Sequence, residues 1–433
     1  MSVNKSIYEK FIIESADQER TADISAGVLA FTYFENIFSP HITARVIVTN
    51  TGGSIKGKDG VLQSIYNGLP LRGGERVIIK IAGNSRVNKG LDFSKNPENY
   101  FHVASITNVL IDEGSETFTL NLVSREAITN ETIRVGKKFP TSQKISDSVK
   151  DIIKKYLRSE DKIGTIDETQ NLYGFIGNMK KPFTIITWLA SKSVSGKSDS
   201  NKEDSSAGFV FYETQDGFNF RSVEKLVSNA QVNSDKKKAK FRYISKGFGG
   251  VDSNSEESNF QIIEYFLDKN IDVRRSLRIG MYSNQSIFYN TQTHSVSYYK
   301  YNLSDQIAGT LGGDGMDTPA DLFAGAPSRQ LFRTSDHGVT SLLIPSRRDE
   351  GDMAISFSRY NLLFTQSLNI LVPCNIKLMV GDVIFCELPS LEAGKGTDID
   401  TKRSGNYLIK ELCHHFSLNQ NTTSLKLIRD SYG

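Results

Sequence analysis

The sequence contains little cysteine, a single tryptophan and no long hydrophobic stretch. Its 433 residues include three cysteines, an odd number gathered near one end: Cys374, Cys386 and Cys413. Such a set does not form the disulfide framework of a small secreted domain, so we expect a protein made in a reducing cytoplasm. No apolar run approaches the roughly 18 residues that cross a bilayer, and the N-terminal segment lacks the features of an export signal. The sequence therefore predicts neither membrane insertion nor export.

A strong charge of one sign is also absent. The chain carries 52 Lys and Arg against 49 Asp and Glu, for a formal net charge of +3, and this balance identifies no class of partner. The sequence is instead long and rich in aromatic residues, with 25 phenylalanines and 17 tyrosines. At about 150 residues per domain, the length predicts roughly three domains rather than one core.

Residues 27–127 show the two-residue period of strands that bury one face. The alternating apolar positions are Ile42, Ala44, Val46 and Val48, then Val77, Ile79 and Ile81, then Phe118, Leu120 and Leu122. Several such strands must share a face before their burial offsets the entropy of ordering the chain. We therefore predict a β-barrel or sandwich at this end of the chain.

The middle of the chain has a different pattern. Residues 145–157 carry an apolar stripe at helical spacing, which predicts an amphipathic helix capped by Thr141 or Ser142. A second helix is predicted from Pro182. Residues 208–223 alternate around an Asp-Gly turn and predict a β-hairpin.

Two polar segments interrupt these patterns, and strand-like sequence returns at the C-terminal end. Residues 193–207 cannot bury themselves and predict a mobile loop, while residues 304–337 are Gly-rich with little periodicity. The strings LPLRGGERVIIKI and IKLMVGDVIFCEL, near opposite ends, share a strand, a glycine turn and a second strand. This similarity indicates an internal repeat.

The predicted fold is mainly β with an α+β middle. We expect a first β domain over residues 1–127 and an α+β domain over 128–227, which contains the hairpin 208–223. A second β domain is expected over 228–433, with the Gly-rich insertion 304–337.

A possible phosphate-binding loop does not match its pattern. Ser195–Ser198 reads SGKS, but the GxxxxGK[ST] pattern requires glycine where Ser191 stands, and no strand precedes it. We interpret this segment as a solvated loop.

A cluster at Cys413, His414 and His415 could bind a metal together with Cys374 or Cys386. Successive strand residues point to opposite faces, however, whereas zinc ligands are spaced so that their side chains converge. We therefore expect half-buried strand residues here. On this interpretation, His414 shares a face with Leu412 and Phe416, and Cys413 shares the other face with Ile409.

Other candidate sites have an ordinary structural explanation. Asp314, Asp317 and Asp321 lack the spacing of a calcium loop, and no GxSxG serine motif occurs. The basic string DKKKAKFR at Asp235–Arg242 could contact phosphates but lacks a repeated aromatic platform, which favours a solvated connector. The sequence therefore predicts no catalytic, cofactor-binding or metal-binding residue, and no enzyme.

Several longer strings resemble the baseplate hub proteins of T-even-like contractile-tailed phages, especially marine relatives that infect cyanobacteria. AFTYFENIFSPHITARVIVTNTGGSI, followed by NGLPLRGGERVIIKI, resembles their opening barrel, and FHVASITNVLIDEGSETFTLNLVSREAITNE resembles the strands that close it. KKPFTIITWLASKSVSG and GFVFYETQDGFNFRSVEKLV are similar to their middle region. LNILVPCNIKLMVGDVIFCELP and SGNYLIKELCHHFSLNQNTTSLKLIRDSYG are similar to the end of their second barrel.

The resemblance implies two similar antiparallel, tube-like β-barrel domains around an α/β middle, with three copies assembled as a ring. Such a homotrimer adapts a threefold central spike, the puncturing protein, to the sixfold tail tube. Its channel passes phage DNA without sequence-specific binding. The implied partners are the spike, the tube or tube-initiator protein and other baseplate proteins. The implied location is the tail baseplate of the virion, after assembly in the host cytoplasm.

Three alternatives remain open on the sequence. One is the hub of another contractile injection system, for which fusion to a needle or an effector would be evidence. Another is a tail enzyme that degrades cell wall or capsule, which would clear purified peptidoglycan or polysaccharide. The third is a nucleic-acid binder, whose duplex affinity would depend steeply on salt.

Overall fold

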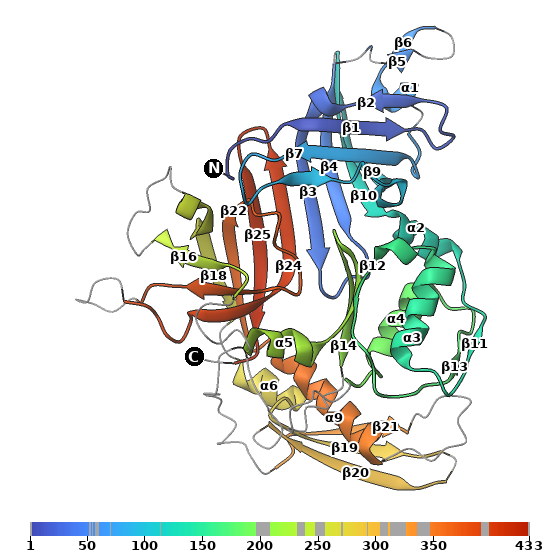
Figure 1. The fold of residues 1–433 in the computed structure, drawn as a ribbon, viewed down its shortest axis with the longest axis vertical. Coiled ribbons are helices and arrows are strands. Elements are labelled where there is room, and N and C mark those ends of the chain that lie inside the picture. Colours follow the sequence, from blue (N-terminus) through green and yellow to red (C-terminus); the bar gives the residue numbers. More distant parts are fainter. Residues whose placement is uncertain are drawn as a thin grey trace.

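The computed structural model describes residues 2–51, 53, 55–56, 60–69, 71–112, 114–195, 208–231, 239–246, 256–269, 272–291, 293–303, 311, 326–335, 347–390 and 398–431. The chain is mainly β, with helices in its middle and C-terminal parts (Figure 1). The strands up to residue 124 are β1 (Tyr8–Glu14), β2 (Thr21–Asp23), β3 (Val28–Asn36), β4 (Thr43–Asn50), β5 (Ile55–Lys56), β6 (Leu62–Gln63), β7 (Arg76–Ala82), β8 (Gly90–Asp92), β9 (Phe101–Asp112) and β10 (Ser115–Ser124), with a short helix α1 (Ile65–Gly68).

The remaining elements follow in two groups. The middle group comprises α2 (Arg125–Thr132), β11 (Lys138–Phe139), α3 (Ile145–Ile152), β12 (Ile163–Ile166), β13 (Phe175–Ile176), α4 (Pro182–Ala190), β14 (Phe209–Thr214), β15 (Gly217–Ser222) and α5 (Val223–Gln231). The C-terminal group comprises β16 (Arg242–Ser245), β17 (Gln261–Ile262), β18 (Glu264–Lys269), α6 (Val273–Ile279), β19 (Ser283–Tyr289), β20 (Val296–Asn302), β21 (Arg329–Thr334), α9 (Arg347–Leu362), β22 (Gln366–Pro373), β23 (Val383–Glu387), β24 (Gly405–Ser417) and β25 (Asn421–Arg429).

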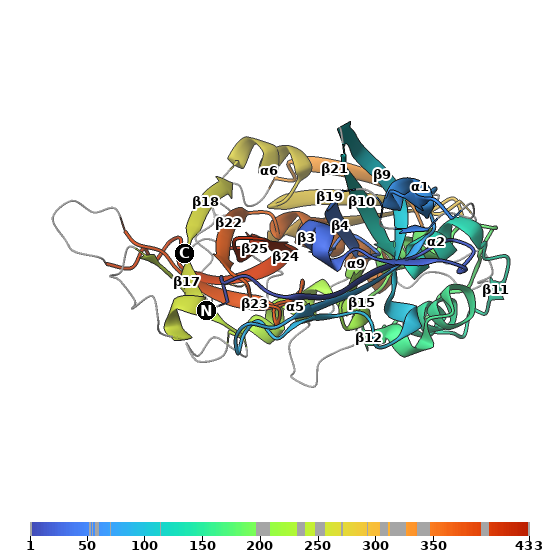
Figure 2. The same cartoon turned by 90° about the horizontal axis from the view of Figure 1, so that it is seen from above.

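One large sheet joins the two ends of the chain. Within it, eight strands run in the order β18-β22-β25-β24-β3-β4-β10-β9, and every neighbouring pair is antiparallel. We call this run the arc, because its strands follow one another along a curve with β18 at one end and β9 at the other (Figure 2). At its centre, the N-terminal strand β3 pairs with the C-terminal strand β24.

The strand order repeats along the chain. In the first half, β7 pairs with β9, β9 with β10, β10 with β4 and β4 with β3. In the second half, β23 pairs with β24, β24 with β25, β25 with β22 and β22 with β18. The two sets of five strands also follow the same order in the sequence, so the internal repeat predicted from the sequence is present in the topology.

The glycine turns that suggested the repeat occupy equivalent places. The backbone N–H of Gly74, before β7, donates to the carbonyl of Val103 in β9, at 2.7 Å. The N–H of Gly381, before β23, donates to the carbonyl of Ile409 in β24, at 3.0 Å. Both glycines have a positive φ, +90° and +87°, a conformation that L side chains rarely adopt.

The middle group forms a second core beside the sheet, while Val210 and Tyr212 of its hairpin and the helix α5 pack into the main core. The hairpin of β14 and β15 is confirmed, as are the alternating buried positions of β4, β7 and β10 and the helix α4, which begins at Pro182. Stacked rings of Phe211 and Phe218, with centroids 5.6 Å apart, help to join the two hairpin strands. Helix α4 packs on this hairpin, and helix α3 packs against α4 and β12, so that both bury their apolar faces in the same core.

The cap predicted for the helix at residues 145–157 is wrong. Helix α3 begins at Ile145, and Lys144 precedes it without a side-chain cap. The backbone N–H of Ser146 instead donates to Oγ1 of Thr169, from a loop 23 residues away, at 3.0 Å. A tertiary contact therefore supplies the cap, and the helix ends in a π-helical turn over Ile153–Leu157.

A small sheet is inserted between β18 and β22. Its order is β20-β19-β21, and helix α9 packs on one of its faces (Figure 1). In the first half, β3 and β4 are joined directly, so this insertion belongs to the second half only.

Candidate functional site

The arc has one apolar face and one polar face. Its apolar side chains, such as Phe31, Val46 and Leu120, are fully buried in the main core. The opposite face carries polar side chains that line up across the strands: Ser105, Asn121, Arg45, Thr32 and His415. A sheet with one solvated face is ordinary for antiparallel strands.

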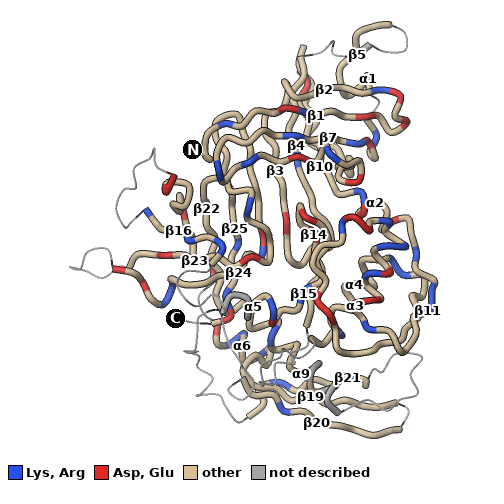
Figure 3. The backbone as a smooth tube through the Cα atoms, in the orientation of Figure 1, with Lys and Arg blue, Asp and Glu red and all other residues tan. Residues whose placement is uncertain are grey.

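The charges of this polar face include two lysines that share one carboxylate. Nζ of Lys426 and Nζ of Lys410 each lie 2.8 Å from a carboxylate oxygen of Glu411. Acidic and basic residues are interspersed along the strands of the arc, without a large region of one sign (Figure 3).

The two ends of the arc are open strand edges. On the side of β9 away from β10, β7 reaches only as far as His102, and no described strand pairs with β9 beyond Val103. On its side away from β22, β18 likewise has no partner strand among the described residues. Both edges expose large apolar side chains: Leu110 (69% exposed) and Ile111 (74%) on β9, and Tyr265 (41%) and Phe266 (64%) on β18. Open edges with exposed apolar residues are typical of surfaces that pair with another chain.

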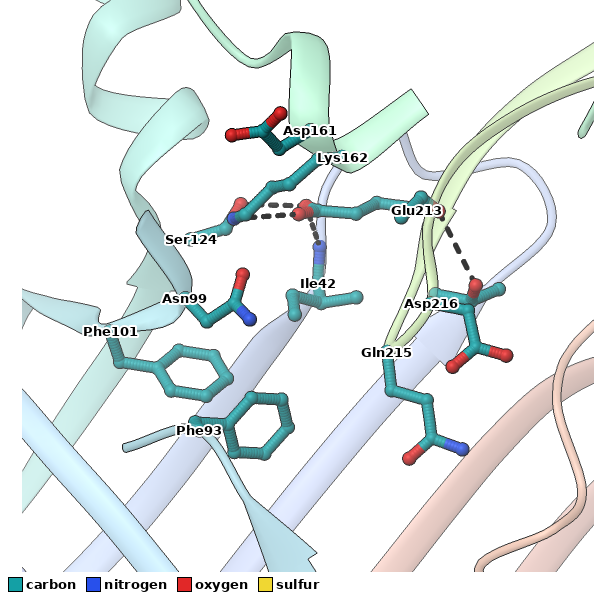
Figure 4. A pocket seen from close by; sticks show the side chains of 12 residues that line it. Ile42, Phe93, Asn99, Phe101, Ser124, Asp161, Lys162, Glu213, Gln215 and Asp216 are labelled. Atoms are coloured by element: carbon teal, nitrogen blue, oxygen red, sulfur yellow. Dashed lines mark hydrogen bonds and ion pairs between the residues drawn. The ribbon is translucent and has the colours of Figure 1, made fainter. Parts of the chain in front are cut away.

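A second polar cluster, this one buried, attaches the hairpin of the middle group to the arc. Glu213, at the end of β14, accepts hydrogen bonds from the backbone N–H of Ile42 (3.0 Å) and from the hydroxyl of Ser124 (2.7 Å). Figure 4 shows the side chains of Lys162 and Glu213 directed toward each other at this point. Nζ of Lys162 lies 3.6 Å from Glu213 and 2.8 Å from Glu126.

The pKa values of the two carboxyl groups beside Lys162 are shifted in opposite directions. Burial raises the pKa of Glu213 to about 7, and Lys162 only partly opposes this effect. Burial also raises the pKa of Glu126, but the Lys162 ammonium and the hydroxyl of Ser159 outweigh it, so that pKa lies below its usual value. Glu126 therefore forms ion pairs with Lys162 and with Arg125, whose guanidinium lies 3.0 Å away, and Glu213 lies within reach of the Lys162 ammonium.

Glu35 anchors the same hairpin from the strand β3. It accepts hydrogen bonds from the hydroxyl of Tyr33 (2.8 Å) and from the backbone N–H groups of Gln215 (2.9 Å) and Val380 (3.1 Å). Burial raises the pKa of Glu35 to about 7, although these three donors act in the opposite direction.

We expect Glu35 to make the protein less stable as the pH rises from about 4.5 to about 7. The ordinary pKa of the carboxyl is 4.5 and the folded value is about 7, so in this range the folded state holds a proton that the unfolded state releases. The contribution is complete below pH 4.5 and is lost by about pH 7, with a size on the order of 3 kcal/mol. Urea unfolding of the wild-type chain and of Glu35→Gln across this range measures it. Identical pH profiles for the two proteins would contradict the expectation.

The hollow beside Glu213 is too small for a ligand. It measures about 80 Å³, and its lining includes Phe93, Phe101 and Asp216. Sites for small molecules commonly measure about 300–1,000 Å³. The cluster is therefore a structural junction rather than a binding pocket.

The residues considered from the sequence do not form a chemical site where the structure describes them. His414 is buried, donates to or accepts from Oγ1 of Thr423 at 2.8 Å, and burial lowers its pKa to about 3. It shares the core face with Leu412 and Phe416, as predicted. Cys374 and Cys386 are buried thiols, and no group of three potential metal ligands occurs among the described residues.

The predicted pairing of Cys413 with Ile409 on one face is wrong. Ile409 is fully buried, whereas Cys413 lies on the polar face. The reason is a β-bulge at Lys410, which shifts the alternation of β24 by one residue.

Several other segments singled out from the sequence lie outside the described residues. They include Asp314, Asp317 and Asp321, residues 196–198 of the SGKS string, and residues 235–238 of the basic string. In the part of the chain that is described, no helix is long and apolar enough to cross a membrane.

Sequence reasoning missed both the open edges and the buried carboxylates. The string Val109-Leu110-Ile111 was available as a signal, because three consecutive apolar residues break the alternation of a half-buried strand. The buried positions of Glu35 and Glu213 have no comparable signal, since they depend on contacts between distant segments.

Comparison with known proteins identifies the fold. No protein-family model matches the sequence, and no curated protein matches it. The fold is similar to that of the tail protein from Neisseria meningitidis MC58, with a TM-score of 0.53, 9% identity, and coverage of 97% of this chain and 96% of that one. It is also similar to the 43 kDa tail protein of prophage MuSo2 from Shewanella oneidensis, with a TM-score of 0.53, 10% identity and coverage of 98% of both chains. The chain thus has the fold of these two tail proteins.

Proposed function

We propose that the chain is a structural hub of a phage tail baseplate, in which three copies form a ring. The ring adapts a threefold central spike to a sixfold tail tube and leaves a channel for DNA. The observation that carries this proposal is the repeated topology of the two halves. Because each chain presents two similar five-stranded units, three chains present six such units around one axis.

The polar face of the arc supports the channel. A wall that passes a polyanion must be polar but must not retain phosphates, and the paired charges around Glu411 meet both requirements. The fold shared with two tail proteins supports the location in a virion, with the spike, the tube or tube initiator and other baseplate proteins as partners.

We further propose the domain division 1–127, 128–227 and 228–433. The second core of the middle group, which includes Val135, Phe175 and Phe220, supports the central unit. The chain acts in this proposal by assembly and not by catalysis.

We expect the purified chain to form a ring of three copies. Light scattering of the purified chain is expected to give three times the monomer mass of 48.2 kDa. Negative-stain averages are expected to show six lobes around an open centre. Compact monomers that persist when the spike protein is added contradict the proposal, and clearing of purified peptidoglycan by the chain would favour the hydrolase alternative.

A further inference from the structure

The pairing of β24 with β3 within one chain indicates how two copies pair with each other, if three copies form the ring proposed above. We call such a contact between two strands a joint. Strand β24 uses one side twice: residues 405–408 pair with β23, and residues 411–417 then pair with β3. The equivalent strand β9 pairs with β7 at residues 101–102 and then has an open edge. The position that β3 occupies beside β24 is therefore empty beside β9.

The equivalent of β3 is also an open edge. In the second half, the strand at that position of the repeat is β18, at the far end of the arc. We propose that residues 105–112 of β9 pair, antiparallel, with β18 of the next copy, in the arrangement that β24 and β3 adopt within one chain. Because the arc has eight alternating strands, its two ends run in opposite directions, and this joint continues the antiparallel pattern from copy to copy.

The register of this joint follows from two matching bulges. In the first half, Val103 pairs with Leu122 and Ser105 pairs with Asn121, so that Ala104 is skipped. In the second half, Ile409 pairs with Leu427 and Glu411 pairs with Lys426, so that Lys410 is skipped. Val103 and Leu122 are thus equivalent to Ile409 and Leu427.

Counting five residues back along each partner strand extends the equivalence to the open edge. The count follows β10 and β25 because β9 has a further bulge between Thr107 and Leu110 that β24 lacks. From Leu122 the count reaches Thr117, which pairs with Leu110, and from Leu427 it reaches Thr422, which pairs with His415. Leu110 is therefore equivalent to His415. The next pair in the ladder of β9 with β10 and the next pair in the ladder of β24 with β25 make Ile111 equivalent to Phe416.

Strand β18 is related to β3 by the pairings that start from the equivalent residues Leu122 and Leu427. Leu122 pairs with Ala44, which pairs with Tyr33, while Leu427 pairs with Leu368, which pairs with Leu267. The next positions along these strands make Phe266 equivalent to Thr32, and Tyr265 equivalent to Phe31.

Within one chain, His415 lies opposite Thr32, and Phe416 lies opposite Phe31. The proposed joint accordingly places Leu110 opposite Phe266, and Ile111 opposite Tyr265, of the next copy. These four residues are the most exposed of the large apolar side chains on the two edges.

Burial at the equivalent positions also supports the assignment. Phe416 and Phe31 are 0% exposed, whereas their equivalents Ile111 and Tyr265 are 74% and 41% exposed in the single chain. A position that is buried in the core in one half of the chain is thus exposed to solvent in the other half. A missing neighbouring strand produces this difference. At its outer end the joint sets Asp112 opposite Glu264, a like-charge pair whose repulsion the apolar pairs must outweigh.

Disulfide trapping tests the joint. Residues directly opposite each other in an antiparallel pair have Cα atoms about 4.5–5.5 Å apart, which a disulfide can bridge. The variant Leu110→Cys with Phe266→Cys is therefore expected to form an intermolecular disulfide on mild oxidation. The products are expected to form a ladder of crosslinked species, with two and then three covalently joined copies and nothing larger. The control Leu110→Cys with Glu264→Cys moves one thiol by two residues, to a separation of roughly 8 Å, and is expected not to crosslink.

The outcomes separate the joint from the ring. The wild-type chain and each single variant give the background from Cys374, Cys386 and Cys413. A three-copy particle that crosslinks in the control but not in the test pair overturns the joint and leaves the proposed function standing. A ladder that continues beyond three copies supports the joint but contradicts the closed ring. A chain that stays monomeric in light scattering and does not crosslink overturns both.

Discussion

Replacing both Ile111 and Phe266 by aspartate is expected to leave the chain folded and monomeric. The two side chains are 74% and 64% exposed in the single chain, so its folding does not depend on them. In the ring we propose, they lie opposite Tyr265 and Leu110 of neighbouring copies. Each buried apolar side chain contributes about 1.5–3 kcal/mol, so we expect the dissociation constant of each joint to rise at least ~100-fold. Analytical ultracentrifugation over a range of concentrations measures this change.

The matched control is Phe332→Asp on β21. Phe332 is 76% exposed, comparable with the test positions, but it belongs to the inserted sheet and not to the arc. This variant is expected to assemble like the wild-type chain. A double variant at Ile111 and Phe266 that still sediments as three copies would show that these edges do not form the contact.

Lys162→Met is expected to destabilise the protein by about 3–5 kcal/mol. Its ammonium is the cation that lies within 4 Å of both Glu126 and Glu213, and all three side chains are buried. Without this ammonium, the only counter-charge that the described residues leave beside the buried Glu126 is the partly exposed Arg125 guanidinium, 3.0 Å away, so we expect a loss toward the lower end of this range. The free energy of unfolding in urea, compared with that of the wild-type chain, measures the effect.

Lys154→Met provides the comparison for this variant. Lys154 pairs with Glu160 in the same region, but both side chains are more than half exposed. Exposed pairs contribute at most about 1 kcal/mol, so this variant is expected to remain close to wild-type stability. Equal losses in the two variants would contradict the structural role given to the buried cluster.

The local parts of the fold could be predicted from the sequence. The alternation in β4, β7 and β10 and the aromatic hairpin of β14 and β15 depend on neighbouring residues, and their side chains lie as expected. Helix α4 was predicted for the same reason, since Pro182 is favourable at the first helical position.

The long-range parts could not be predicted in the same way. The pairing of β3 with β24 joins residues about 380 positions apart, and nothing in either strand specifies the other. The bulge at Lys410 reverses the facing of the residues of β24 beyond it, so strict alternation assigns Ile409 and Cys413 to one face although they lie on opposite faces. The buried carboxylates of Glu35 and Glu213 become recognisable only when the hairpin is placed against the sheet.

The joint between β24 and β3 also affects how quickly a ring can assemble. Of the six contacts around such a ring, this joint supplies three, and each forms as a chain folds. Because its two strands are tethered, their effective concentration is set by the chain that connects them and does not fall when the protein is diluted. Only the three contacts between chains then require diffusional encounter. Duplication within one polypeptide therefore converts half of the assembly reaction into folding, and it lowers the protein concentration at which closed rings accumulate.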